Sequence, residues 1–253
     1  ERQKSLATFG HVMSAIHDEE ELKSLLEPIL SIGRDFTFLK RKVALMSALF
    51  LAHGDVGVWL LSMDGAVREC LTLIASGDEI GQALAAEALC LAASNEGGRS
   101  LLGPVVESGT LDALLDSPNA RARSAAASTM AKLGVAAKAL ASDSPETGRL
   151  LNTAMLLLKG AEESLENTSA EQKFTESASV TTERAVEVLA ALVTKSAVKD
   201  EICHGSGRCS NALSRLCSVS KDGRGASAYG LAHIFAALTV TNKEVQERIL
   251  AEK

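Results

Sequence analysis

The chain has 253 residues, 46% hydrophobic and 23% charged, a composition typical of a globular protein that buries a sizeable core. A net charge of −6 without a lysine and arginine stripe argues against a nucleic-acid partner, because neutralising phosphates requires a basic face. Its apolar runs stay below the roughly 18 residues that a membrane-spanning helix needs, so we expect no membrane partner.

The residue types favour helices throughout. Alanine and leucine are frequent, aromatic residues make up only 3%, and four prolines leave room for long uninterrupted helices. We therefore predict an all-α protein. Five cysteines, an odd number without a disulfide-like framework, favour a reducing compartment, and we expect a cytoplasmic location. The sequence shows no signal peptide. It begins at Glu1 rather than at methionine, so we also expect it to be a piece of a longer protein.

Five segments along the chain resemble one another. Each holds a large residue after a small or β-branched one, with apolar or small residues four positions before it and three after it. The segments are Val43–His53, Ala83–Ser94, Ser124–Gly134, Arg184–Thr194 and Gly230–Val240. Offsets of three and four lie on one helical face, so each segment is predicted to be a helix with one buried stripe.

The spacing of these segments predicts a repeat protein. The aligned large residues are Leu49, Leu89, Met130, Leu189 and Phe235, at intervals of 40, 41, 59 and 46 residues. A period near 40 to 46 with about three helices per unit is typical of armadillo and HEAT repeats. Such units cannot bury their apolar faces alone, so we predict a right-handed α-solenoid of armadillo/HEAT-like repeats.

Shorter helical patterns precede the aligned segments, at Val67–Ile74, Leu111–Leu115 and Leu213–Cys217. Capping signals predict the helix ends. We expect one helix to begin at Ser117-Pro118 and end at Gly134, and another to begin at Ser144-Pro145 and end at Gly160. A capping box at Thr241–Glu244 predicts the start of a last helix.

The 59-residue interval exceeds one repeat and predicts an insertion. The segment Gly160–Thr182, "GAEESLENTSAEQKFTESASVTT", is rich in glutamate, serine and threonine and holds few apolar residues. We predict a flexible acidic loop over 161–182.

The order of details within the repeats resembles one family. Gln82–Gly134 runs "QALAAEALCLAASNEGGRSLLGPVVESGTLDALLDSPNARARSAAASTMAKLG", and Glu183–Ile202 runs "ERAVEVLAALVTKSAVKDEI". These segments, with "SAYGLAHIFAALTVTNKE" at Ser227–Glu244, resemble the animal UCS-family myosin chaperones. The resemblance covers about 56–244, from the central armadillo region into the start of the UCS domain. The chain departs from the family at Ala185, where the family has tryptophan.

The resemblance implies a domain organisation and a function. It implies armadillo repeats of the central region over 1–160 and repeats of the UCS domain over 183–253. It implies a non-catalytic module that binds the myosin motor domain and assists its folding or assembly with Hsp90, which a domain outside this chain would bind. No cofactor, metal or nucleotide is implied. Partner-binding candidates on the expected concave face are Tyr229, Asn242 and Lys243.

Other hypotheses remain beside this one. Cys203, His204, Cys209 and Cys217 could form a metal site or a catalytic pair, but their spacing matches no common zinc pattern and no nucleophile motif surrounds them. We expect neither metal nor enzyme activity. The alternative is an armadillo adaptor or scaffold for an extended peptide. Apart from partner contacts, Tyr229 and His233 are interpreted as packing residues.

Overall fold

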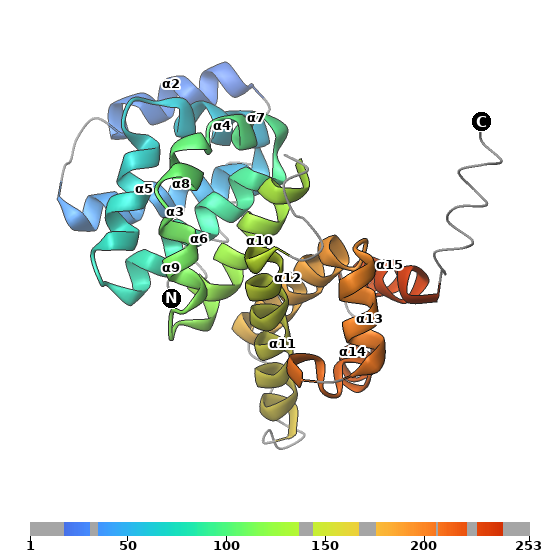
Figure 1. The fold of residues 1–253 in the computed structure, drawn as a ribbon. Helices are drawn as coiled ribbons and strands as arrows, with labels where there is room; N and C mark the ends of the chain where they lie inside the picture. The colour runs from blue at the N-terminus through green and yellow to red at the C-terminus, as the bar shows by residue number, and fades with distance from the viewer. Residues whose placement is uncertain are drawn as a thin grey trace. The chain divides into compact units, whose positions relative to one another are not determined.

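The computed structural model describes residues 18–30, 35–136, 144–166, 176–205, 207–221 and 227–239 (Figure 1). All the regular structure of these ranges is helical and none of it is β-strand, which confirms the all-α prediction. The chain divides into two compact units, Glu1–Thr129 and Met130–Lys253. The boundary between them falls inside one helix, α10, which spans Ala120–Ala136.

The first unit alternates long helices with short ones. In chain order these are α2 (Glu19–Leu30), α3 (Phe36–Ala52), α4 (Gly54–Ser62), α5 (Ala66–Ala75), α6 (Glu79–Ser94), α7 (Glu96–Ser100), α8 (Gly103–Glu107), α9 (Thr110–Leu115) and the start of α10. The long helices α3, α6 and α10 contain the first three aligned segments. Two shorter helices, α4 and α5, lie between α3 and α6, and three, α7, α8 and α9, lie between α6 and α10.

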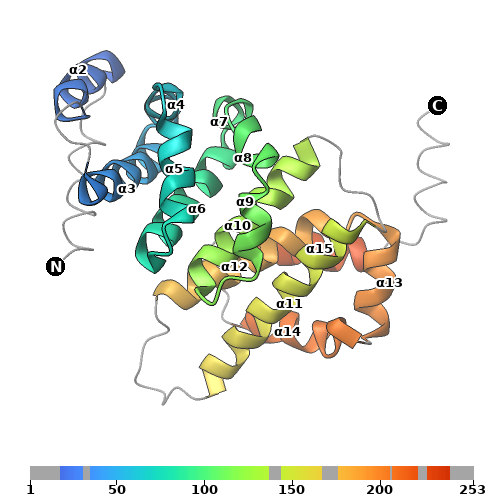
Figure 2. The same cartoon turned by 60° about the vertical axis from the view of Figure 1, so that its left-hand side comes forward.

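The long helices α3 and α6 pack directly against each other, and both views draw them side by side (Figures 1 and 2). Helix α5 also packs on α6, while α4 packs on α3 and α5. The core between them contains Met46, Leu49 and Leu89, which are fully buried. Small residues such as Ala85 and Ala92, also fully buried, allow the helices to approach closely.

The second unit contains the end of α10 and the remaining helices. These are α11 (Pro145–Glu166), α12 (Glu176–Leu192), α13 (Ser196–His204), the 3₁₀ turn η1 (Gly207–Cys209), α14 (Ala212–Lys221) and α15 (Ser227–Thr239). Helix α11 packs along α12, and α12 packs against α15. Leu150, Leu158 and Leu189 are fully buried in this unit. Each described helix of the protein is too short or too polar to cross a membrane.

The aligned positions are confirmed as core positions in three of the five segments. Leu49, Leu89 and Leu189 are fully buried, whereas Met130 and Phe235 are half-buried. The short helix α9 also follows the prediction, because its three leucines are buried. Helix α14 does not: Leu213 and Cys217 are exposed and only Leu216 of the predicted stripe is buried. Its apolar stripe covers less of its neighbours than helical spacing alone predicted.

The predicted helix ends are correct at Ser144 and wrong at three other places. Ser144 caps α11, since its Oγ accepts a hydrogen bond from the Thr147 amide at 3.1 Å. Helix α10, however, begins after Asn119 rather than at Ser117-Pro118, because Asn119 Oδ1 accepts from the first-turn amides. The glycines do not end their helices either. Helix α10 continues past Gly134, and α11 continues past Gly160 to Glu166.

The loop predicted over 161–182 is too long. Helix α11 extends to Glu166 and α12 already begins at Glu176, so the described parts of this range are helical. The physical reason is packing: Ala161, Thr181 and Thr182 are buried, and α11 lies along α12. The other part of the predicted loop, 167–175, and the capping box at 241–244 lie outside the described residues.

Candidate functional site

One of the three predicted partner-binding residues lies within the described structure. Tyr229 stands in the first turn of α15, and 83% of it is exposed. The interpretation of its ring as a packing residue is therefore wrong. His233, one turn later, is exposed as well. Asn242 and Lys243 lie outside the described residues, so their placement beside Tyr229 stays a prediction.

The opposite face of α15 holds this helix in place. Leu231 and Ile234 are buried, while Phe235 and Leu238 are half-buried. The backbone of α15 approaches α12 closely at Gly230, where a Cβ atom would lie 2.7 Å from Val186 Cγ1. This face of α15 packs on α12, whereas the side chain of Tyr229 is exposed to solvent.

Exposed apolar side chains also occur on the aligned helices of the first unit. Leu51 near the end of α3 is 74% exposed, and Ile80 at the start of α6 is 52% exposed. Single exposed apolar residues are ordinary on protein surfaces. Leu51, Ile80 and Tyr229 nevertheless share one property, since each stands on a helix that carries an aligned segment.

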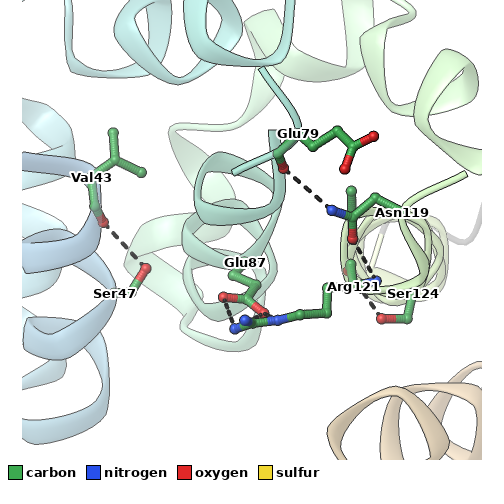
Figure 3. Close-up of polar contacts among 8 residues, drawn as sticks. Val43, Ser47, Glu79, Glu87, Asn119, Arg121 and Ser124 are labelled. Carbon is green, nitrogen blue, oxygen red and sulfur yellow. Dashed lines mark hydrogen bonds and ion pairs between the residues drawn. The ribbon is translucent and has the colours of Figure 1, made fainter. Parts of the chain in front are cut away.

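Polar contacts join neighbouring aligned helices. Arg121 of α10 binds Glu87 of α6 through two hydrogen bonds of 3.0 Å, from Nε to Oε1 and from Nη2 to Oε2 (Figure 3). In the second unit, Lys132 Nζ of α10 lies 3.1 Å from Glu187 Oε2 of α12. Glu87 and Glu187 occupy the same position in the alignment, two residues before the aligned leucine. The repeat alignment thus also predicts where carboxylates meet a basic residue of a neighbouring aligned helix.

The starts of the aligned helices are joined as well. Lys40 Nζ of α3 donates to Asp78 Oδ2, the cap of α6, at 3.2 Å. Asn119 Nδ2, beside the cap oxygen of α10, donates to the carbonyl oxygen of Glu79 at 3.3 Å (Figure 3). The pKa of Asp78 lies below its usual value because its carboxylate accepts from the Gly81 amide and, secondly, from Lys40.

A partly buried ion pair joins α3 to α5. Lys42 Nζ lies 2.6 Å from Glu69 Oε2, and only 9% of the lysine side chain is exposed. That carboxylate oxygen is buried and accepts no hydrogen bond of good geometry within the described structure, so charge attraction holds the pair together. Burial, followed by the neighbouring Glu69 carboxylate, raises the pKa of the Cys70 thiol to about 12. This thiol is therefore a neutral core residue at physiological pH.

The cysteines and histidine considered as a metal or catalytic site lie in different environments. Cys203 and Cys217 are exposed, whereas Cys209 is buried. Nδ1 of His204 lies 2.6 Å from the carbonyl oxygen of Asp200 in its own helix. Among the described residues, no three His, Cys, Asp or Glu side chains gather closely enough to hold a metal ion.

The same segment contains a structural clamp. Arg208 donates from Nε and Nη2 to the two carboxylate oxygens of Glu201, at 2.6 and 2.8 Å, and from Nη1 to the carbonyl oxygen of Gly148 at 2.9 Å. It ties η1 to α13 and α11. Burial and the nearby Glu201 raise the pKa of the Cys209 thiol to about 11. Such a thiol is a poor nucleophile at neutral pH.

Sequence reasoning missed the contacts between helix starts, although one signal for them was present. Asp35, Asp78 and Asn119 each cap an aligned helix and recur at intervals of 43 and 41 residues. Applying the capping preferences to all three repeats would have located α10 correctly. No family model matches this chain, and no curated protein is found to be similar to it.

Proposed function

We propose that this chain is a non-catalytic, protein-binding module of a UCS-type myosin co-chaperone, built as a right-handed armadillo α-solenoid. It binds the myosin motor domain and assists its folding or assembly, and a domain outside this chain recruits Hsp90. The module acts in the cytoplasm, without a cofactor. The motif order from Gln82 to Glu244 carries the assignment to this family.

The structural observation in favour of this proposal is that each aligned helix contacts the next aligned helix along the chain. Within the first unit, α3 packs on α6, and α6 contacts α10 through the Glu87–Arg121 pair. Within the second unit, α10 contacts α12 through Lys132 and Glu187, and α12 packs on α15. Successive contacts of equivalent helices are what a solenoid of stacked repeats requires.

Each unit exposes apolar side chains on its aligned helices, which agrees with this proposal. In a solenoid the last helix of each repeat lines the concave face. Leu51 and Ile80 in the first unit, and Tyr229 in the second, expose apolar surface from aligned helices. Partly unfolded clients expose apolar segments of their own, so these side chains suit a chaperone that acts by binding alone. Tyrosine is also among the residues that contribute most to protein–protein binding energy.

The test uses the whole chain and a purified myosin motor domain. Binding is measured by calorimetry. Protection of the motor domain from aggregation is measured by light scattering during mild heating. We expect the wild type to bind and to suppress aggregation. Tyr229→Ala should weaken binding by about tenfold or more, without unfolding the module, because the side chain is exposed.

Leu156→Ala is the matched control, since Leu156 is an exposed apolar residue of α11, outside the aligned helices. It should leave binding unchanged. A wild-type chain that binds no myosin motor domain rejects the proposal. Binding to an extended peptide instead would favour the adaptor hypothesis.

A further inference from the structure

We propose that the N-cap side chains of α6 and α10 are ties between repeats. Each one closes the first turn of its own helix and also holds the preceding aligned helix, so capping and repeat stacking occur as one event. The inference concerns the first unit alone and does not depend on the identity of the partner.

The tie at α6 uses a single carboxylate oxygen. Asp78 Oδ2 accepts from the Gly81 amide of its own helix at 2.7 Å and from Lys40 Nζ of α3 at 3.2 Å. The lysine is itself restrained, because Nζ lies 5.1 Å from the centre of the Phe36 ring. Asp78 therefore joins the start of α6 to a positioned cation on α3.

The tie at α10 uses both ends of an amide. Asn119 Oδ1 accepts from the amides of Arg121 and Ala122 at 3.0 and 3.3 Å, which closes the first turn of α10. Its Nδ2 donates to the carbonyl oxygen of Glu79 at 3.3 Å, which reaches the start of α6 (Figure 3). One side chain thus bonds two helices.

The two ties meet at the N-terminus of α6. Asp78 and Glu79 are consecutive, so Lys40, the start of α6 and Asn119 form one continuous connection from α3 to α10. A serine or threonine could cap either helix, but its hydroxyl is held closer to the backbone. Asn119 instead uses one polar atom for its own helix and a second, separate atom for the neighbouring helix.

Two substitutions at Asn119 distinguish its capping of α10 from its hydrogen bond to α6. Asn119→Ser keeps a cap oxygen and stays neutral but removes the amide donor, whereas Asn119→Ala removes both functions. Hydrogen exchange is followed at Gly81 and Gln82 of α6 and at Arg121 and Ala122 of α10. The whole chain is used, and circular dichroism checks that it remains folded.

We expect Asn119→Ser to speed exchange in the first turn of α6 by about fivefold, equivalent to one lost hydrogen bond, while the first turn of α10 stays protected. Asn119→Ala should speed exchange in both turns. Lys40→Met, which removes the other tie and leaves Asp78 as a cap, should also speed exchange at Gly81 and Gln82.

Asn95→Ser is the matched control. Asn95 caps α7 by accepting from the Gly98 amide at 3.2 Å, and within the described structure no hydrogen bond joins its side chain to another helix. Asn95 lies at the other end of α6, so this substitution should leave exchange in the first turns of α6 and α10 unchanged. If exchange in the first turn of α6 is also unchanged in Asn119→Ser, each cap serves only its own helix and the proposal is overturned.

Discussion

Gly230 shows how one residue decides where a helix lies. In an exposed helix, replacing glycine by alanine usually stabilises a protein, by up to about 1 kcal/mol. At Gly230 a Cβ atom would lie 2.7 Å from Val186 Cγ1, and Val186 is buried. The gain in helix propensity is therefore opposed by an overpacked contact between α15 and α12.

We expect Gly230→Ala to destabilise the protein by about 1–2 kcal/mol, because overpacking costs more than propensity supplies. The control is Gly160→Ala in α11, where a Cβ atom would meet no heavy atom of the described residues within 4 Å. That change should stabilise the protein slightly. Urea denaturation measures both, and a stabilised Gly230→Ala variant would show that α15 can move away from α12.

The pair of Lys42 and Glu69 makes a second prediction at the scale of residues. Lys42→Met fills a similar volume but leaves the Glu69 carboxylate beside the core without its cation. We expect a loss of roughly 1 kcal/mol, the lower end of the cost of an unpaired buried polar group, because 34% of the Glu69 side chain is exposed to water. Adding Glu69→Gln removes that charge and should restore part of the lost stability in the same denaturation experiment. A double variant less stable than Lys42→Met would contradict this account.

At the scale of elements, a helix cap does more than set where its helix begins. Asp78 and Asn119, which begin α6 and α10, each also contact the preceding aligned helix. The aligned helices therefore start at corresponding positions along the chain, and carboxylates equivalent in the alignment meet a basic residue of an adjacent aligned helix. A capping substitution should accordingly affect two helices.

The cap of α6 should make this link sensitive to acid. The pKa of Asp78 is lowered in the folded protein, so its contribution to stability is present above its unfolded pKa of about 4 and is lost as pH falls through the folded value. Asp78→Ser caps the helix without titrating. The stability difference between wild type and this variant should shrink between pH 7 and pH 3, measured by urea midpoints. A difference that stays constant over this range would show that the carboxylate charge contributes nothing.

At the scale of the whole molecule, burial separates the cysteines into two classes. Cys70 and Cys209 are buried thiols whose pKa values are raised to about 12 and about 11. Cys203 and Cys217 are exposed. A brief pulse of iodoacetamide at pH 8, read by mass spectrometry, should label Cys203 and Cys217 first.

Cys70 and Cys209 should react only after unfolding in urea, because few of their thiols ionise in the folded protein and reagent access is poor. Labelling of Cys209 at the rate of Cys203 would show that the segment clamped by Arg208 opens readily. The same experiment tests whether the two compact units protect their cores equally, since Cys70 belongs to the first and Cys209 to the second.

Much of the fold could be predicted from the sequence, because helical periodicity is a local property. Spacing of three and four placed Leu49, Leu89 and Leu189 on buried stripes, and all three are core residues. Helix ends were less predictable, since glycine ends a helix only when no packing favours its continuation. Gly160 shows this: the helix continues beyond it to a buried Ala161.

The candidate site was predicted less well, for a physical reason. Sequence can place Tyr229 on a helix, but whether its ring packs or points to solvent depends on which elements cover that helix. Cys203, Cys209 and Cys217 likewise looked like a possible cluster because they are close in the chain. Folding buries one of them and leaves the other two exposed.

The sequence by itself determined that this protein is helical and which side chains most often face its core. These properties follow from residue type and from the period of the helix, and both operate over a few neighbouring residues. Only the tertiary structure decided that Asp78 and Asn119 join helices, that Gly230 lies against Val186 and that Tyr229 is exposed. Those contacts join residues brought together by helix packing, and their distances are set when the apolar faces meet.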